Sequence, residues 1–362
     1  MEKKTVLVAM SGGVDSSVAA ALLVEQGHTV IGVTMKTFCY QEAEAELTGP
    51  TRSCCGLDGI LDARQVADRL GIAHYVFDVE REFTRDVIDD FVSEYASGRT
   101  PNPCVRCNGN TKFRDLLRRG RMLGCDAIAT GHYARMGADG DGNPLLLRGV
   151  DADKDQSYFL WALPPEILPQ LLFPLGELTK PRVREIARDL GLVTADKPES
   201  MEICFVPDGD YPRFLKKRLG AEHDALAPGA LVTTTGEVIG EHDGYARYTV
   251  GQRKGLGGGR ALPLYVLGSR PERREVVVGT LDELHRPRAT IGELNWLAAR
   301  PSPGDAVQVQ IRHRARAVPA RVAEVSEGAI TLAFESPQRA VSPGQSAVMF
   351  AGDVVLGGGR IR

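Results

Sequence analysis

A glycine-rich turn near the N-terminus constrains this chain more than any other stretch. The turn, Ser11–Ser17, follows an apolar run at Thr5–Met10 that is typical of a buried strand. A helical pattern at Val18–Gln26 comes directly after it and stops before Gly27. In such a unit the glycines let backbone N–H groups approach an anion, and the helix N-terminus carries a partial positive charge. The sequence therefore predicts a phosphate cradle in an α/β domain. The alternative is an ordinary strand-to-helix turn with a Ser/Asp cap.

The spacing of this turn excludes two common nucleotide-binding loops. No Gly-Lys-Ser/Thr follows, so it is not a Walker A loop, and it lacks the GxGxxG spacing of dinucleotide folds. Ser16 and Ser17 add hydroxyl donors, while Asp15 either holds Mg²⁺ or orients the loop. The turn resembles the SGGxDS signature of the PP-loop ATP pyrophosphatases, which implies ATP and Mg²⁺ as ligands and cleavage between the α- and β-phosphates. The residues that this resemblance places at ATP are Ala9, Met10, Ser11, Gly12, Gly13, Val14, Asp15, Ser16, Met35 and Gly131.

Composition narrows the class of protein further. A chain of 362 residues, 43% hydrophobic and 25% charged, is expected to fold into two or three domains rather than remain disordered. The net charge of −3 provides no global cationic field, so RNA contacts require a local basic patch. No signal-peptide pattern or membrane-length apolar run is visible, so we expect a cytoplasmic protein with no membrane partner.

The first half of the chain alternates strand and helix patterns. Strands are predicted at 29–35, 73–78 and 127–130, and helices at 57–70, 84–97, 112–123 and 180–190, with a hairpin joining 133–136 to 145–148. This alternation predicts a doubly wound parallel sheet. Ligands of such sheets bind beyond the carboxyl ends of the strands, where Met35, Gly131 and His132 are expected to lie.

Short strands separated by glycine turns replace this pattern after about residue 207. The pairs 231–234 and 237–239 predict a hairpin, and 251–259 reads as a basic loop. From about residue 288, Val307, Val309 and Ile311 alternate with polar residues, which predicts an antiparallel barrel or sandwich. The expected domains are 1–206 for the PP-loop catalytic domain, 207–287 for a small, mostly β central domain, and 288–362 for a C-terminal antiparallel β-barrel.

Seven cysteines in a cytoplasmic chain of this size indicate catalytic, metal-binding or buried thiols rather than a disulfide framework. Two of them, Cys104 and Cys107, lie in the Pro- and Asn-rich stretch Arg99–Asn108, which we predict to be an exposed loop. Cys204 also lies in a connecting segment. Cys125 is expected in the core, Cys54 and Cys55 are expected as exposed bystanders, and Cys39 has no predicted role.

Nearly the whole chain resembles the tRNA-specific 2-thiouridylases, a family of the PP-loop superfamily. The stretches that carry this resemblance are Ser11–Ser17, Gly98–Asn108, Ala129–Tyr133, Lys154–Phe159, Ile203–Phe205, Gly251–Gly255 and Ser342–Ala347. The PP-loop alone indicates only the superfamily. The two cysteine segments, together with Lys154–Phe159, make the resemblance specific.

The resemblance implies ATP-dependent replacement of O2 by sulfur on the wobble uridine of tRNAs for lysine, glutamate and glutamine. Adenylation turns O2 into a leaving group, and a cysteine persulfide supplies reactive sulfur. Cys204 would carry the persulfide, and Cys107 would attack it, release sulfide and leave a transient Cys107–Cys204 disulfide. An upstream sulfur-donor protein, a cysteine desulfurase or a relay, would load Cys204.

One residue departs from the family pattern and opens an alternative. The family often has Asp at position 104, whereas this chain has Cys104, which creates a Cys104-x-x-Cys107 pair. With Cys204, these thiolates form a possible ligand set for a [4Fe–4S] cluster with one open iron, and that cluster would then carry the sulfur.

Expected RNA contacts fall in three stretches. A dense basic patch, Arg312–Arg316 with Arg321, is typical of phosphate binding, the alternative being a solvated barrel face. By resemblance, the residues expected to contact tRNA or its target base are Asn102, Pro103, Cys104, His132, Lys154, Asp155, Gln156, Arg312, His313 and Gln345.

Two other functions remain open from the sequence. Another PP-loop enzyme that adenylates a tRNA or a metabolite would need no Cys107/Cys204 pair. A non-catalytic RNA-binding or redox-sensing protein would need no intact Ser11–Ser17 turn.

Overall fold

The computed structural model describes every residue except 1–2, 38–56, 199–202 and 257–261. The chain divides into two compact units, each built from discontinuous segments. The first unit comprises residues 1–87, 104–209 and 353–355, and the second comprises 88–103, 210–352 and 356–362. Cys39, Cys54 and Cys55, and the end of the 251–259 stretch, lie outside the described residues. None of the described helices combines the length and apolar character needed to cross a bilayer.

A parallel five-stranded sheet organises the first unit. Its strand order is β3-β2-β1-β4-β7, which places β1 at the centre of the sheet. The strands are β1 (Thr5–Ala9), β2 (Thr29–Lys36), β3 (Ala73–Asp78), β4 (Ala127–Thr130) and β7 (Leu171–Leu172). The predicted strands at 29–35, 73–78 and 127–130 are confirmed.

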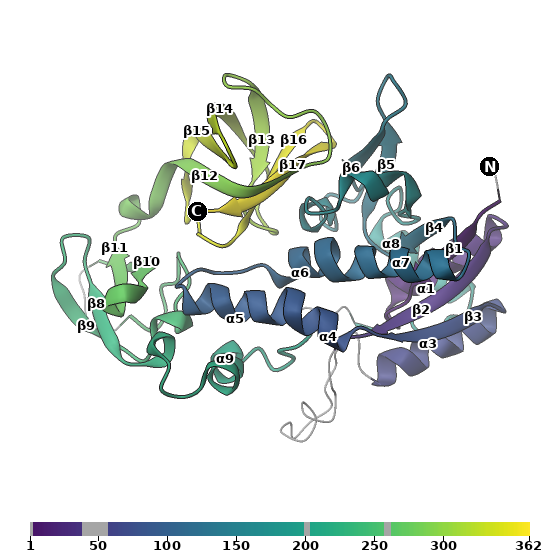
Figure 1. Cartoon of the computed structure of the whole chain (residues 1–362), viewed down its shortest axis with the longest axis horizontal. Helices are drawn as coiled ribbons and strands as arrows, with labels where there is room; N and C mark the ends of the chain where they lie inside the picture. The colour runs from purple at the N-terminus through teal and green to yellow at the C-terminus, as the bar shows by residue number, and fades with distance from the viewer. Residues whose placement is uncertain (1–2, 38–56, 199–202, 257–261) are drawn as a thin grey trace. The chain divides into compact units, whose positions relative to one another are not determined.

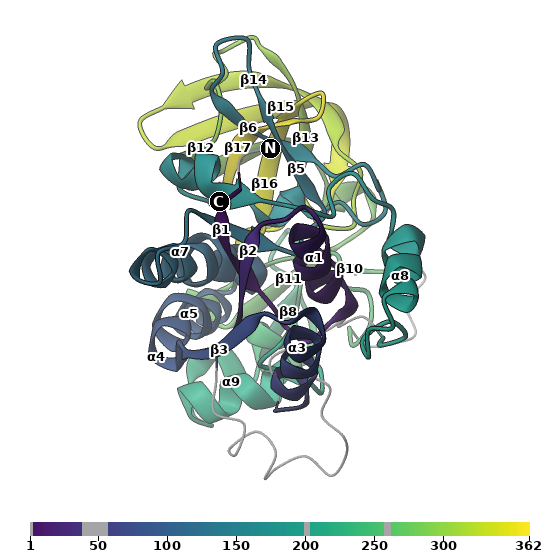
Figure 2. The same cartoon turned by 90° about the vertical axis from the view of Figure 1, so that its right-hand side faces the viewer.

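Helices cover both faces of this sheet, as Figures 1 and 2 show. Three helices pack together on one side, α1 (Val14–Glu25), α3 (Leu57–Leu70) and α8 (Lys180–Asp189), while α7 (Phe113–Met122) contacts β1 and β4 from the other. The doubly wound α/β prediction is therefore confirmed.

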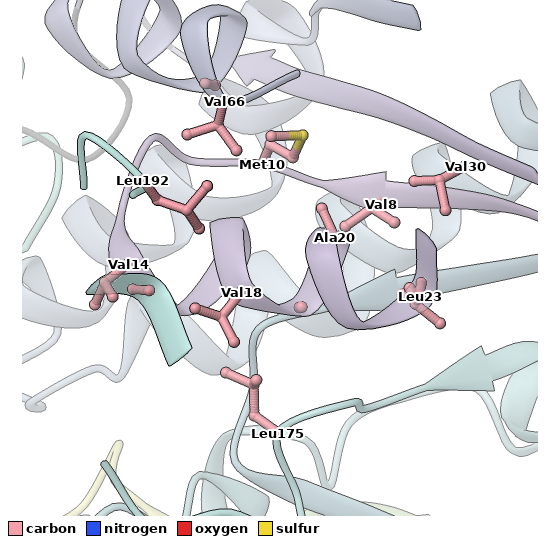
Figure 3. Close-up of a cluster of buried hydrophobic side chains, with 14 of the residues drawn as sticks. Val8, Met10, Val14, Val18, Ala20, Leu23, Val30, Val66, Leu175 and Leu192 are labelled. Atoms are coloured by element: carbon pink, nitrogen blue, oxygen red, sulfur yellow. The ribbon is translucent and has the colours of Figure 1, made fainter. Parts of the chain in front are cut away.

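The core of this unit forms around α1. Figure 3 shows Val14, Val18 and Leu23 of α1 among side chains from the sheet and from Val66 and Leu192. Because α1 is covered by the sheet, α3 and α8, most of its residues are buried, including the short Ser16 and Ser17. Burial of this helix fixes the position of the turn that precedes it.

A hairpin also belongs to the first unit. Strands β5 (Ala134–Ala138) and β6 (Pro144–Arg148) pair antiparallel, as the sequence predicts. Leu147 of β6 pairs with Val354, the first residue of β17 (Val354–Ile361), and Arg135 forms an ion pair with Asp353.

The second unit contains a small mixed sheet with two helices. The sheet order is β10-β11-β8-β9, and its strands are β8 (Gly229–Val232), β9 (Val238–His242), β10 (Tyr265–Arg270) and β11 (Glu275–Gly279). Helix α5 (Asp89–Ala96) packs on α9 (Tyr211–Leu219), because Phe91 meets Phe214 edge-on and Tyr95 stacks on Tyr211.

A six-stranded antiparallel barrel completes the second unit. The order β12-β15-β14-β13-β16-β17 closes through pairing of β12 with β17. Its further strands are β12 (His285–Trp296), β13 (Ala306–Gln310), β14 (Val318–Ser326), β15 (Ala329–Arg339) and β16 (Ser346–Ala351). Val307, Val309 and Ile311 face its core, which confirms the predicted alternation.

Helix geometry differs from the sequence prediction at two places. The helix expected at 84–97 begins earlier, as α4 (Glu80–Phe83), and passes through a π-helical turn at Thr84–Ile88 before α5. The loop expected at 99–108 is wrong over its second half, where α6 (Pro103–Arg106) and a π-helical turn at Cys107–Lys112 lead into α7. Proline is well suited to the first position of a helix, because its missing N–H would have no helical partner there.

Candidate functional site

The predicted phosphate cradle lies at the carboxyl end of β1, where Ser11–Gly13 leads into α1. Gly12 has a φ of 71°, and a Cβ atom added there would lie 2.2 Å from the Gly59 carbonyl oxygen, so only glycine fits. The Ser16 and Ser17 hydroxyls both donate to the Gly13 carbonyl oxygen, at 3.1 and 2.9 Å. Ser16 Oγ also accepts from the Ser11 N–H at 3.1 Å. These bonds hold a preformed turn at a helix N-terminus, which is the geometry that binds phosphates.

Neighbouring strands support the cradle from both sides. Gly131 follows β4, and a Cβ atom added to it would lie 2.7 Å from the Ser16 backbone nitrogen, so the chain packs tightly on the turn there. Met10 is buried, and its carbonyl accepts from the Thr34 hydroxyl of β2 at 2.7 Å. Met35 is likewise buried near the end of β2. The structure thus places the expected residues Ala9, Met10 and Gly131 at the cradle, and Met35 on the adjacent strand.

Asp15 is held by a buried cation that sequence reasoning missed. Lys180 Nζ lies 2.7 Å from both Asp15 carboxylate oxygens, and the Tyr133 hydroxyl donates to Oδ1 at 2.8 Å. The Lys180 side chain is 8% exposed and that of Asp15 is 34% exposed. Because both oxygens accept hydrogen bonds from the protein, this geometry favours the loop-orienting role over direct Mg²⁺ coordination. The only sequence signal was that Lys180 starts the predicted helix after Thr179.

A second lysine reaches the same turn from the segment after α8. Lys197 Nζ donates to the Gly12 carbonyl oxygen at 2.9 Å and to the Asp62 carboxylate of α3 at 2.5 Å. Nothing in the sequence pattern singles out Lys197, because it lies in a short connecting segment.

The helical segment that carries Cys104 and Cys107 has unusual geometry. Cys104 is exposed, whereas Cys107 is half-buried and begins the π-helical turn. Asn108 is buried within that turn, and its amide donates to the Phe159 carbonyl at 3.1 Å. A Cβ atom added at Gly109 would lie 2.7 Å from the Ala162 carbonyl oxygen. Wide turns of this kind are frequent at functional sites, and this one is packed directly on the segment after Lys154–Phe159.

The described cysteines differ in exposure and do not gather into a metal site. Cys204 is half-buried, and Cys125 is buried in the core as expected. Across the part of the chain that the structure describes, no three His, Cys, Asp or Glu side chains are arranged to hold a metal ion. Cys104, Cys107 and Cys204 therefore do not form a ready-made metal site within the described residues.

The predicted tRNA-contact stretch at 154–156 serves the fold as well. Asp155 accepts from the Gly149 N–H, the Ser157 N–H and hydroxyl, and Arg148 Nη1, so its carboxylate is engaged within the unit. Gln156 Oε1 accepts from the Tyr133 N–H at 3.0 Å. Lys154 is half-buried. These contacts tie the stretch to Tyr133, and through it to Asp15.

His132 is a neutral aromatic group rather than a cation. Its Nδ1 lies 2.7 Å from the Thr130 hydroxyl, and its ring stacks on Phe113. Burial holds the pKa of His132 well below its ordinary value, and the charge of Lys112 lowers that pKa further. At neutral pH the imidazole therefore offers a hydrogen bond or a stacking face, and does not supply positive charge.

In the second unit, Gln345 contacts the segment that precedes α6. Its amide donates to the Thr100 and Pro101 carbonyls at 2.9 and 3.1 Å, and the Thr100 N–H donates to the Pro343 carbonyl at 2.9 Å. The structure thereby brings Gln345 next to the stretch that ends in Asn102 and Pro103.

The basic patch of the barrel contains one half-buried arginine and several exposed residues. Arg312 Nη2 donates to the Ala340 carbonyl at 2.5 Å, to the Ser342 hydroxyl at 3.2 Å and to the Val250 carbonyl at 3.4 Å. Arg312 therefore braces the barrel, whereas His313, Arg314, Arg316 and Arg321 are exposed.

Comparison with known proteins adds independent evidence. Three family models match consecutive parts of the chain: "tRNA methyl transferase HUP domain" at residues 4–208, "tRNA methyl transferase PRC-barrel domain" at 213–280 and "Aminomethyltransferase beta-barrel domain" at 287–361. These matches agree with a parallel-sheet domain followed by two mainly β domains.

Curated relatives match almost end to end. The tRNA-specific 2-thiouridylase MnmA of Geotalea uraniireducens (strain Rf4) is 50% identical over 360 residues, covering 99% of this chain and 95% of the relative. The protein of the same name from Geobacter metallireducens (strain ATCC 53774 / DSM 7210 / GS-15) is 50% identical over 359 residues, covering 99% and 97%. A solved 4-thiouridine synthetase–RNA complex with bound ATP shares 16% identity over 60% of this chain and 51% of that chain. Its TM-score against this chain is 0.35.

Proposed function

Because this chain belongs to the tRNA-specific 2-thiouridylase family, we propose that it uses ATP to exchange a uridine oxygen of tRNA for sulfur. The chain is an enzyme, a tRNA sulfurtransferase. The observation that carries the ATP-dependent part is the preformed cradle between β1 and α1, in the same unit as Cys107 and Cys204.

The first half-reaction is adenylation. The uridine O2 attacks the α-phosphorus of ATP, the bond to the β-phosphate oxygen breaks, and pyrophosphate leaves with that electron pair. Backbone N–H groups of the cradle and the positive end of α1 would bind the phosphates, and Mg²⁺ would accompany ATP as part of the substrate. Asp15, fixed by Lys180 and Tyr133, keeps the turn in shape before ATP arrives.

The second half-reaction delivers sulfur. A persulfide on Cys204 is attacked by the Cys107 thiolate, so that a Cys107–Cys204 disulfide forms and hydrosulfide leaves. Hydrosulfide then attacks C2 of the adenylated uridine, and AMP leaves with the former O2. A cellular thiol reductant resets the disulfide, and a donor protein carrying a persulfide reloads Cys204. No step is assigned to an iron–sulfur cluster, because the described residues contain no group of three His, Cys, Asp or Glu side chains that could hold a metal ion.

The finer assignments are part of this proposal. The target is the wobble uridine of tRNAs for lysine, glutamate and glutamine, and Asn102, Pro103 and Cys104 lie at the target base. Lys154 and Gln156 face the anticodon loop, together with the neutral His132. Asp155 is assigned a supporting role, because its carboxylate is fully used within the fold. The domain division 1–206, 207–287 and 288–362 and a cytoplasmic location stay predictions.

We expect the enzyme to convert ATP to AMP and pyrophosphate only when unmodified substrate tRNA is present. The measurement is product analysis by thin-layer chromatography, alongside 2-thiouridine detection in digested tRNA when persulfide or sulfide is supplied. ADP and phosphate as the tRNA-dependent products would contradict the PP-loop chemistry. Pyrophosphate release without any thiolation would favour another adenylating enzyme, and no tRNA-dependent cleavage would favour a non-catalytic RNA-binding protein.

We expect exposed arginines of the barrel to bind tRNA phosphates, and Arg312 to act through the fold instead. Arg314→Ala and Arg316→Ala should each lower the salt slope of tRNA binding by about one unit, equally for all three substrate tRNAs. The single-turnover rate at saturating tRNA should stay unchanged. Arg312→Ala should instead lower the thermal midpoint, because it removes hydrogen bonds to Ala340, Ser342 and Val250. Unchanged affinity and slope for both exposed variants would make this patch a solvated barrel face.

A further inference from the structure

Two lysines described above contact the cradle, and Lys197 is the more exposed of them. Its side chain is 33% exposed and that of its partner Asp62 is 29% exposed. Lys180, by comparison, is 8% exposed and bonded to both oxygens of Asp15. A phosphate could recruit Lys180 only if this more deeply buried lysine broke its contacts with both Asp15 carboxylate oxygens.

The backbone around Lys197 is firmly anchored. Arg184 of α8 donates to the Ala195 and Lys197 carbonyls, at 2.8 and 3.2 Å. The opposite side of the contact is also fixed, because Gly12 packs directly on the Gly59 backbone of α3. The Lys197 ammonium is therefore delivered to the Gly12 position by rigid elements, and only its flexible stem is left to adjust.

The present partners of this ammonium are ones that an incoming triphosphate can replace. A backbone carbonyl is a neutral acceptor, whereas phosphate oxygens form charge-assisted hydrogen bonds that are roughly twice as strong. The Gly12 carbonyl belongs to the turn that would bind the phosphates, so the exchange requires only a small movement of Nζ. Asp62 competes with the phosphates for the same ammonium.

We propose that Lys197 binds the β- and γ-phosphates of ATP and stabilises the negative charge that develops on pyrophosphate as it leaves. This inference rests on the proposed cleavage of ATP to AMP and pyrophosphate. Lys197 keeps its proton throughout and donates hydrogen bonds, while the electron pair of the broken α-phosphorus–oxygen bond stays on pyrophosphate. Asp62 holds the ammonium at Gly12 until ATP arrives.

Product inhibition separates this role from a structural one. Pyrophosphate and AMP are each added to the complete tRNA-dependent assay, and the inhibition constant of each is measured. Lys197→Met should raise the inhibition constant for pyrophosphate at least about tenfold, the loss expected for a hydrogen bond to a charged group, and leave that for AMP within about twofold. Lys197→Arg should restore most of the pyrophosphate inhibition, because it restores the positive charge.

Replacing Asp62, the partner of Lys197, should not raise the inhibition constant for pyrophosphate. Asp62→Asn should leave pyrophosphate inhibition equal to or stronger than that of the unchanged enzyme, because it removes the competing carboxylate. A merely structural ion pair would make Lys197→Met and Asp62→Asn behave alike. The matched control is Arg188→Met, which breaks the exposed Arg188–Asp196 pair nearby and should change neither constant.

The outcomes distinguish this inference from the function on which it rests. If the unchanged enzyme releases no pyrophosphate and is not inhibited by it, the proposed ATP chemistry fails and the inference fails with it. If the unchanged enzyme behaves as proposed but Lys197→Met weakens AMP and pyrophosphate equally, only the inference is overturned. Equal losses in Lys197→Met and Asp62→Asn overturn it as well. If Lys197→Met folds poorly, Lys197→Gln replaces it in the same inhibition assay. The direction in which Asp62→Asn changes the inhibition constant for pyrophosphate then provides the second test.

Discussion

Replacing Cys107 or Cys204 by serine is expected to abolish 2-thiouridine formation while tRNA-dependent pyrophosphate release continues. The persulfide needs one sulfur to carry it and a second to resolve it, and a hydroxyl can do neither. In the proposed mechanism, adenylation depends on the cradle at Ser11–Ser17 and uses no thiol. Thiolation should fall by about a thousandfold or more in each variant, as for loss of a covalent nucleophile. The measurement is a paired assay of pyrophosphate and of 2-thiouridine on the same tRNA sample.

The remaining described cysteines provide the controls. Cys125→Ala should retain thiolation, because Cys125 is buried in the core and burial raises the pKa of its thiol, which keeps it protonated and unreactive. Cys104→Ala should lower thiolation far less than the serine variants do, since the exposed Cys104 is proposed to contact the target base but takes no part in a covalent step. Activity in Cys204→Ser would reject the persulfide assignment. Loss of activity in Cys104→Ala together with iron in anaerobically purified enzyme would instead support a cluster.

Asp15→Ala is expected to destabilise the first unit by about 3 kcal/mol and to abolish ATP cleavage. The change removes the carboxylate that pairs with Lys180 and leaves an ammonium in a largely buried site, an effect typically of this size. It also removes the acceptor of the Tyr133 hydroxyl. The measurements are the free energy of unfolding of the first unit in urea, and ATP binding under native conditions.

Matched variants identify the cause of that loss. Lys180→Met alone should cost less, because the remaining Asp15 is about one-third exposed and keeps its bond from Tyr133. In the double variant Asp15→Ala/Lys180→Met much of the stability should return, because no buried charge is left unpaired. Lys36→Met, which breaks solvent-accessible pairs with Asp78 and Glu80, should leave the free energy of unfolding almost unchanged. A double variant no more stable than Asp15→Ala would show that the ion pair is not the reason.

Local pattern was sufficient for the elements that frame the cradle. Apolar runs of strand length at 29–35, 73–78 and 127–130, separated by helical patterns, predicted the parallel sheet. The alternation around Val307 likewise predicted the barrel face. These predictions succeed because side-chain periodicity and glycine turns are local properties, fixed within a few residues by backbone geometry.

The cysteine stretch shows where local pattern misleads. Two prolines and two asparagines between residues 101 and 108 are typical of a loop, yet the chain turns helical at Pro103 and widens at Cys107. Gly109 of the wide turn packs against Ala162, and the Asn108 amide donates to the Phe159 carbonyl. Asn108 and Phe159 are 51 residues apart in the sequence. Tertiary packing overrides the loop preference here, because burying these residues stabilises a helical conformation that their intrinsic propensities disfavour.

The sequence by itself determined the glycine turn between β1 and α1, the parallel sheet and the barrel, since each depends on neighbours in the chain. The roles of Cys107 and Cys204 came from the family resemblance and stay predictions. Only the tertiary structure decided what the cradle's charges do. Lys180 meets Asp15 across 165 residues and Lys197 meets Gly12 across 185. Arg312, which belongs to a basic run in the sequence, turns inward to brace the barrel. What a charged side chain can do depends on the local dielectric and on its charged and hydrogen-bonding partners. Those surroundings come from segments that are distant in the sequence and meet only in the folded chain.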